Sequence, residues 1–219
     1  MVTRNTQNRP VGHTAPQDEK KGESQTFIKP TRLALFVSGS GTNCENIIRY
    51  FQSRPDVVIS LVVSNRSDAY ALVRAENFGV PSVVVTRDQL NDNKDAVLHL
   101  LQHIDYIILA GFLPKVPEYL IEAFPDRIIN IHPALLPKFG GKGMWGHHVH
   151  EAVKAAGETR SGITIHFVNA ELDQGEHIAQ FSTRISPDDT AEDIAEKVHR
   201  LEMAYFPQVI DQVIKGNIV

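Results

Sequence analysis

The chain has a single cysteine, no long apolar run and no excess of basic charge, and each absence excludes a class of protein. With Cys44 alone among 219 residues, an internal disulfide and a cysteine-based zinc site are both excluded, which favours a reducing compartment. No apolar run approaches the roughly 20 residues of a membrane-spanning helix, and the first thirty residues lack the apolar segment of a secretory signal. The formal net charge of −4 disfavours nucleic acid, which normally requires a basic face. We therefore expect a cytoplasmic protein that binds neither nucleic acid nor membrane.

Two parts of the chain differ in composition. Residues 1–28 contain almost no large apolar side chain, so they cannot bury enough surface to offset the entropy of ordering. We expect a disordered N-terminal arm there, with a docking tail for a partner as the alternative. The whole chain is 42% hydrophobic and 22% charged, as is usual for a globular protein. Residues 29–219 are therefore predicted to form one catalytic domain.

From Arg32 onward, strand-like apolar runs alternate with amphipathic segments. The pattern predicts strands at 33–37, 57–63, 82–85, 106–110 and 127–131, with helices at 42–51, 69–78, 94–103 and 117–124. Such alternation is typical of parallel strands joined by right-handed crossovers, with helices on both faces of the sheet. A helix at 148–156, strands at 162–168 and 178–185 and a long helix at 190–214 follow.

The expected fold is therefore a Rossmann-like α/β three-layer sandwich. Its twisted sheet is mostly parallel, with an antiparallel edge strand toward the C-terminus, and a long C-terminal helix closes the domain.

A glycine-rich loop, SGSGTN at 38–43, lies between the first predicted strand and the first predicted helix. Glycines let the backbone approach an anion, and the helix that follows offers unpaired N–H groups and the positive end of its dipole. A dinucleotide site would require a third glycine at position 44 and an acidic residue after the second strand, which instead ends VSNR at 63–66. The loop is not followed by Gly-Lys-Ser/Thr, so the sequence does not indicate a magnesium-nucleotide site. A phosphate monoester fits best, and a plain strand-to-helix turn is the alternative.

Asn130 and His132 stand at the end of the strand predicted at 127–131, just before Pro133. Residues two apart on a strand leave it on the same face, and the carboxyl end of such a strand is where α/β sheets bind ligands. An amide can donate to an oxyanion and an imidazole can move a proton near neutral pH. Glu171 or Asp173, in the loop after the 162–168 strand, could supply the carboxylate that orients the imidazole.

No nucleophilic serine or cysteine stands beside a base in this pattern. The set therefore indicates direct acyl-type transfer through a tetrahedral intermediate, without a covalent enzyme adduct. Each residue also has a structural alternative, since an asparagine before proline can cap a turn and a single histidine is often structural.

Five separated segments together resemble the phosphoribosylglycinamide formyltransferase family. They occur in the order found in that family and extend over nearly all of residues 32–210: SGSGTN at 38–43, LAGFLPK at 109–115, NIHPALLP at 130–137, GITIHFV at 162–168 and LDQG at 172–175. The resemblance implies an enzyme of purine synthesis that moves a formyl group from 10-formyltetrahydrofolate to the amine of glycinamide ribonucleotide, without a metal. Its partners would be these small molecules, and the enzyme would be a monomer or a homodimer.

The resemblance also implies roles for residues. Asn130 would donate to the developing oxyanion, and His132, held protonated by Asp173, would stabilise that charge and relay the proton. The phosphate and ribonucleotide would bind at Gly39, Ser40, Gly41, Thr42, Asn43, Gly111, His199 and Glu202. The folate would bind at Lys94, Leu113, Pro114, Lys115, Val116, Ala170, Glu171 and Leu172, largely through backbone groups and apolar contact.

The chain departs from the family pattern in three places. Many members read Gly-Phe-Met-Arg where this chain reads GFLPK at 111–115, so the basic residue is displaced by one. Position 199 is histidine in place of the more usual glutamine or lysine, which predicts substrate affinity that depends on pH. The loop at 139–150 is longer and richer in glycine. We expect it to be a mobile lid over the substrate, with its three histidines as ordinary surface groups and not metal ligands.

Three alternatives remain beside this assignment. Methionyl-tRNA formyltransferase is disfavoured by the acidic charge and by the lack of a following RNA-binding domain. Formyltetrahydrofolate hydrolases carry an additional N-terminal regulatory domain, which 28 polar residues cannot form. A non-catalytic sensor of a phosphate ligand would use the same glycine loop but would need none of Asn130, His132 and Asp173.

Overall fold

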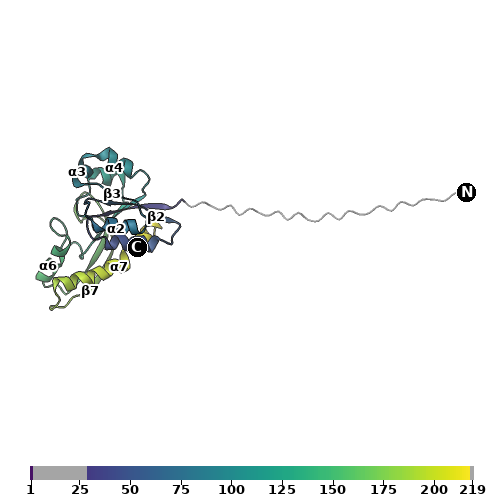
Figure 1. Ribbon diagram of the computed structural model, residues 1–219. Coiled ribbons are helices and arrows are strands. Elements are labelled where there is room, and N and C mark those ends of the chain that lie inside the picture. Colours follow the sequence, from purple (N-terminus) through teal and green to yellow (C-terminus); the bar gives the residue numbers. More distant parts are fainter. Residues whose placement is uncertain (2–28, 218–219) are drawn as a thin grey trace.

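The computed structural model describes Met1 and residues 29–217, so nearly all of the predicted arm lies outside the described residues. Within that range the strands form one sheet in the order β3-β2-β1-β4-β5-β6-β7. Its two edge strands, β3 and β7, lie apart in Figure 1. Their bounds are β1 (Thr31–Val37), β2 (Val57–Ser64), β3 (Ser82–Val84), β4 (Tyr106–Leu109), β5 (Ile128–His132), β6 (Arg160–Phe167) and β7 (His177–Arg184). Strands β1 to β5 pair in parallel, whereas β6 is antiparallel to both of its neighbours. The mostly parallel sheet with antiparallel pairing toward the C-terminus is thereby confirmed.

The helices also follow the predicted alternation. Their bounds are α1 (Thr42–Phe51), α2 (Tyr70–Asn77), α3 (Arg87–Asp92), α4 (Lys94–Leu100), α5 (Glu118–Ala123), α6 (His147–Ala155) and α7 (Ala191–Ile214). Helix α3 was not predicted because its six residues bury only Leu90, too few for a periodic pattern. A capping box between Thr86 and Gln89 starts it instead. The long C-terminal helix is confirmed, and a capping box of Thr190 and Asp193 fixes its start.

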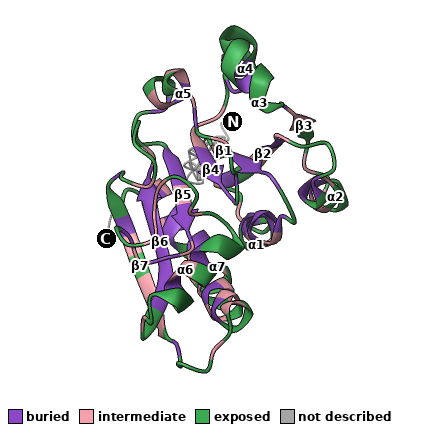
Figure 2. Ribbon diagram, turned by 90° about the vertical axis from the view of Figure 1, so that its left-hand side faces the viewer, coloured by how far each residue is buried: buried purple, intermediate pink, exposed green. Residues whose placement is uncertain are grey.

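Two apolar cores lie on opposite faces of the sheet, because successive side chains of a strand point to opposite sides. In β1, Leu33 and Leu35 belong to the core that also takes side chains of α1, α2, α6 and α7. Ala34 and Phe36 belong to the second core, which takes side chains of α3, α4 and α5. Figure 2 shows the buried strands between these two sets of helices, so the three-layer sandwich is confirmed.

The strand order places a ligand-binding crevice beside β1. From β1 the chain adds β2 and β3 on one side, and it then returns to add β4 on the other. In open α/β sheets ligands bind outside the carboxyl ends of the strands at such a switch point. Here the loops after β1, β2 and β4 are bonded together. The N–H of Leu113 donates to Ser38 Oγ at 2.9 Å, and that hydroxyl donates to Asn65 Oδ1 at 2.6 Å.

Candidate active site

The glycine loop is packed closely against α2. Gly41 has a φ of +75°, and a Cβ there would lie 2.5 Å from the Cβ of Ala71, so only glycine fits without displacement. The loop is also held by hydrogen bonds, from Ala71 N–H to Gly39 O at 3.1 Å and from Arg74 Nε to Ser40 O at 2.8 Å. The first turn of α1 then begins at Thr42, where backbone N–H groups can donate hydrogen bonds to an anion. Arg74 is a part of this loop's support that sequence reasoning missed.

Glu202 joins the long helix α7 to the glycine loop. Its Oε2 accepts from Asn43 Nδ2 at 3.0 Å and from His199 Nδ1 at 3.1 Å. The hydrogen bond to Glu202 raises the pKa of His199 above its ordinary value, although partial burial opposes the rise. The structure thus brings Asn43, His199 and Glu202 together as the resemblance implied, and their contact with the ribonucleotide stays a prediction.

His150 corrects the expectation that the histidines of the 139–150 loop are surface groups. His147 and His148 are exposed, whereas His150 is only 7% exposed, on α6. Its Nδ1 is enclosed and has no hydrogen-bond partner among the described residues. Burial lowers the pKa of His150, the charge of Glu202 raises it, and the charges of His147 and His132 lower it. Burial therefore favours the neutral form of this imidazole. The sequence alone did not predict the burial of His150, because it depends on where α6 begins and how that helix packs.

Asn130, His132 and Asp173 meet at the carboxyl end of β5. His132 is 4% exposed, its Nε2–H donates to Phe139 O at 2.8 Å, and its Nδ1 lies 3.6 Å from Asp173 Oδ2. Asp173, and not Glu171, is the carboxylate beside the imidazole. That 3.6 Å separation is longer than a hydrogen bond, so Nδ1 faces the carboxylate without being bonded to it.

Asp173 has an unusual backbone. Its φ of +56° is rare for a residue other than glycine and costs about 1 kcal/mol or more. The conformation turns the carboxylate back to the site, where Oδ2 accepts from Gly141 N–H at 2.8 Å. Backbone strain of this kind concentrates at functional sites, which supports a role for Asp173 beyond packing.

His166 is the fourth polar group of this cluster, and sequence reasoning did not single it out. It lies opposite Asn130 in the antiparallel pairing of β5 with β6, and its Nε2 is 3.1 Å from Asn130 Nδ2. His166 is 2% exposed, and its Nε2 lies 3.8 Å from Asp173 Oδ1. The alternation of 162–168 places His166 on a polar face with Thr164, but only the strand register shows that this face meets Asn130.

The loop at 139–150 is bonded to His132 and Asp173. Its Phe139 carbonyl accepts from His132 and its Gly141 N–H donates to Asp173. Gly141, Gly143 and Gly146 all have positive φ angles, which explains the glycine content noted in the sequence. Whether the loop opens as a lid stays a prediction.

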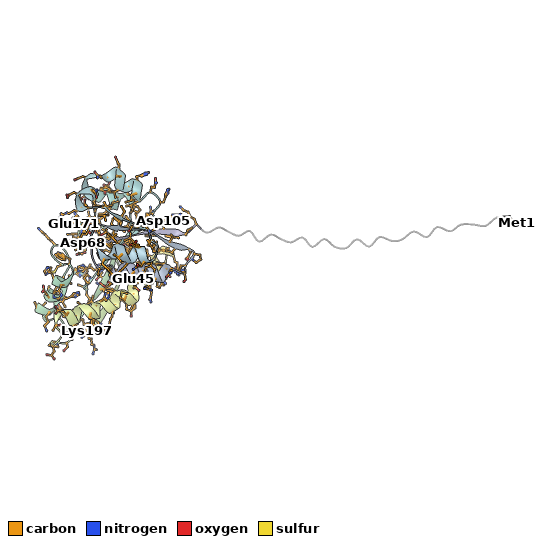
Figure 3. All side chains as sticks on the ribbon, in the orientation of Figure 1. Met1, Glu45, Asp68, Asp105, Glu171 and Lys197 are labelled. Atoms are coloured by element: carbon orange, nitrogen blue, oxygen red, sulfur yellow. The ribbon has the colours of Figure 1, made fainter. Side chains whose placement is uncertain are left out.

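The residues predicted to bind folate occupy two loops and one helix. Leu113 and Leu172 are 54% and 44% exposed, as an apolar contact surface requires, and Glu171 lies at the surface (Figure 3). Pro114 is half-buried, and Ala170 and Lys115 are exposed. Val116 is 5% exposed and packs in the core beneath α5, so its backbone alone is left for a ligand.

Lys94 and Gly111 complete the predicted set. Gly111 follows β4 with a φ of +80°, at the switch point. The ammonium of Lys94 lies 5.9 Å above the ring of Tyr119, and no described contact joins it to Asn130, His132 or Asp173. All of these folate and phosphate contacts stay predictions.

Metal and membrane features are absent from the described part of the chain. Between residues 29 and 217 no three His, Cys, Asp or Glu side chains are placed to hold a metal ion. His147 and His148 lie 3.2–3.5 Å from carboxylate oxygens of Glu151 and Glu192. No helix within the same range is both long and apolar enough to cross a membrane.

Comparison with known proteins agrees with this geometry. Residues 31–210 match the model of the formyl transferase family. Phosphoribosylglycinamide formyltransferase of Haemophilus influenzae is 34% identical over 193 residues, which cover 85% of this chain and 89% of that protein. The chloroplastic enzyme of Arabidopsis thaliana is 38% identical over 196 residues, which cover 85% of this chain but only 66% of the longer plant protein.

Solved structures agree as well. Phosphoribosylglycinamide formyltransferase from Anaplasma phagocytophilum superposes with a TM-score of 0.77 at 35% identity, covering 86% of this chain and 89% of that one. The Streptococcus pneumoniae enzyme gives a TM-score of 0.74 at 33% identity, covering 84% and 99%. The chain therefore belongs to the formyl transferase family, among the phosphoribosylglycinamide formyltransferases.

Proposed function

We propose that this chain transfers the formyl group of 10-formyltetrahydrofolate to the amine of glycinamide ribonucleotide, a step of purine synthesis. The observation that carries the proposal is the position of two sites at one sheet edge. The helix start that suits a phosphate follows β1, and the triad of Asn130, His132 and Asp173 gathers at the end of β5. Only β4 separates these strands, which puts them about 10 Å apart. A phosphoribosyl group with its glycinamide arm can cover that distance.

The chemistry needs an oxyanion donor and a route for one proton. The substrate amine attacks the formyl carbon and forms a new C–N bond, and the carbonyl oxygen becomes an oxyanion that the Asn130 amide stabilises by donating a hydrogen bond. The imidazolium of His132, balanced by Asp173, stabilises the same charge. As the intermediate collapses, the bond to N10 of the folate breaks, and the proton lost by the amine reaches N10 through His132. Each preorganised donor to the oxyanion is typically worth about 10²–10³ in rate.

The phosphate end supplies binding energy without taking part in the chemistry. N–H groups of the first turn of α1 and the positive end of its dipole favour an anion. His199 adds a cation when protonated, and Glu202 holds Asn43 in place through the 3.0 Å bond. In this proposal residues 29–219 are one catalytic domain, supported by the single sheet. Location in the cytoplasm and the choice between monomer and homodimer stay predictions, since two plant relatives are named chloroplastic.

Consumption of 10-formyltetrahydrofolate, measured by absorbance with and without glycinamide ribonucleotide, tests the proposal. We expect turnover only when the ribonucleotide is present. Equal turnover in its absence would indicate a hydrolase, and no turnover in either case would indicate a sensor of phosphate ligands.

A further inference from the structure

His166 is held on both sides of its ring. It is 2% exposed on β6, and its Nδ1 lies 2.8 Å from the carbonyl oxygen of Phe167. On the opposite side its Nε2 lies 3.1 Å from Asn130 Nδ2. The Phe167 carbonyl is closely packed, because Gly175 passes so near that a Cβ there would lie 1.6 Å from that oxygen.

These two contacts determine where the proton of His166 lies. A carbonyl oxygen can only accept a hydrogen bond, so Nδ1 carries the proton. Burial is the largest influence on His166 and lowers its pKa, which favours the neutral ring. The hydrogen bond to the Phe167 carbonyl and the charge of Asp173 act in the opposite direction, and the charges of His132 and His177 add to the lowering. A neutral ring with its proton on Nδ1 has a lone pair on Nε2, and Nε2 must therefore accept a hydrogen bond.

The Asn130 amide is oriented as a consequence. Because Nε2 accepts, the atom facing it must be the amide nitrogen, and one of the two N–H groups of Asn130 is used in this bond. The second N–H then points in a fixed direction, away from His166. The orientation follows from the Phe167 carbonyl, and does not depend on telling the nitrogen of an amide from its oxygen.

We propose that His166 is a positioning residue, a neutral imidazole protonated on Nδ1 that directs the second N–H of Asn130 at the formyl oxygen. The proposal rests on the proposed function, since it names the group that prepares the oxyanion donor. Protonation of Nε2 would make it a donor and force the amide to turn its oxygen toward His166. Neither N–H of Asn130 would then be directed by His166.

The tautomer can be read directly by NMR of the full chain labelled with ¹⁵N-histidine. We expect His166, assigned by comparison with His166→Gln, to show a protonated Nδ1 and an unprotonated Nε2 between pH 7 and 8. A proton on Nε2 in this range would overturn the proposal. This experiment needs no turnover, so its result is independent of whether the chain proves to be a formyltransferase.

Kinetics then test whether His166 acts through Asn130. His166→Leu should lower kcat roughly 10²-fold with little change in the Kd of the ribonucleotide, whereas His166→Gln, which keeps an acceptor near the Nε2 position, should recover most of the rate. In the Asn130→Ala background, His166→Leu should cost nothing further. If the losses of kcat from Asn130→Ala and His166→Leu multiply in the double variant, His166 does not act through Asn130. A His166→Gln variant as slow as His166→Leu would also refute the positioning role.

A matched control is available on the adjacent strand. His177 pairs with His166 in the register of β6 and β7 but is exposed. His177→Leu should leave kcat unchanged, and thermal unfolding of every variant reports whether the fold is intact.

Discussion

At the scale of the residue, the triad combines groups from distant parts of the chain. Asn130 and His132 come from one strand, and Asp173 comes from a loop about forty residues later. Alternation along a strand was enough to place Asn130 and His132 on one face. His166 and His150 were not found in this way, because strand register and the burial of a helix start depend on contacts between distant segments.

Removal of either proton-handling group should affect the chemical step more than binding. We expect His132→Ala and Asp173→Asn each to lower kcat by roughly 10²–10³, because both groups act chiefly in the transition state. Asn keeps the size and tolerates the positive φ of position 173, so the backbone should persist. The Kd of the ribonucleotide, measured by calorimetry, should change little. Glu176→Gln, an exposed carboxylate in the same region, is the control. Near wild-type kcat in either triad variant would disprove these roles.

His199 should make substrate affinity depend on pH. Its pKa is raised, so the imidazole is protonated below that raised value and loses its charge as pH increases through it. The substrate phosphate is mainly a dianion above pH 7, because its second pKa is about 6. The KM for the ribonucleotide should therefore rise with pH from 7 upward.

Steady-state kinetics of His199→Gln check this dependence. The KM of this variant should vary far less with pH, while His103→Gln, an exposed histidine far along the chain, should behave as wild type. An identical profile in His199→Gln and wild type would mean that the histidine does not act on the phosphate.

At the scale of the element, the glycine loop depends on the close approach of α1 and α2. Gly41→Ala combines a φ of +75° with a clash against Ala71 and should reduce the free energy of unfolding by about 1–3 kcal/mol. The loop must also shift, so the KM for the ribonucleotide should increase at least ~10-fold, equal to about 1.4 kcal/mol of lost binding.

Gly79→Ala separates backbone strain from the clash. Gly79 has a similar φ of +66° but nothing within 4 Å of the added Cβ. This variant should lose about 1 kcal/mol of stability with no change in KM. Equal KM values in the two alanine variants would show that the loop's fit against α2 does not matter for phosphate binding.

Most elements were predictable because their periodicity is strong, as in the amphipathic α1 and in α7 with its capping box. Short elements were harder. Helix α4 ends at Leu100, three residues before the predicted end, and α3 has too few buried positions to stand out. Their boundaries are set by packing against the sheet, which a local pattern does not contain.

At the scale of the whole molecule, the repeated strand-helix alternation was sufficient to predict the three-layer fold. It was not sufficient to predict the strand order, in which β1 lies between β2 and β4. That order decides which loops lie next to one another at the carboxyl ends of the strands, and so it brings the glycine loop close to the triad. The local sequence patterns do not contain this proximity. It was implied by the five-segment resemblance, in which one substrate reaches both the glycine loop and the triad.

The N-terminal arm should be dispensable for catalysis. None of the predicted site residues lies in residues 1–28, so a chain starting at residue 29 should keep kcat and both KM values within about twofold, a difference of roughly 0.4 kcal/mol. Loss of activity on truncation would instead favour a docking role or a contribution of the arm to the site.

The central claim, direct transfer between two bound substrates at the triad, is tested most directly by following the formyl group itself. A single turnover with formyl-labelled ¹³C-10-formyltetrahydrofolate and glycinamide ribonucleotide should place all of the label on the amine of the ribonucleotide, with none in formate. In Asp173→Asn, with both substrates bound, the label should still be on the folate after the time in which the wild-type protein completes its turnover. Label released as formate, or full transfer by Asp173→Asn, would contradict the account.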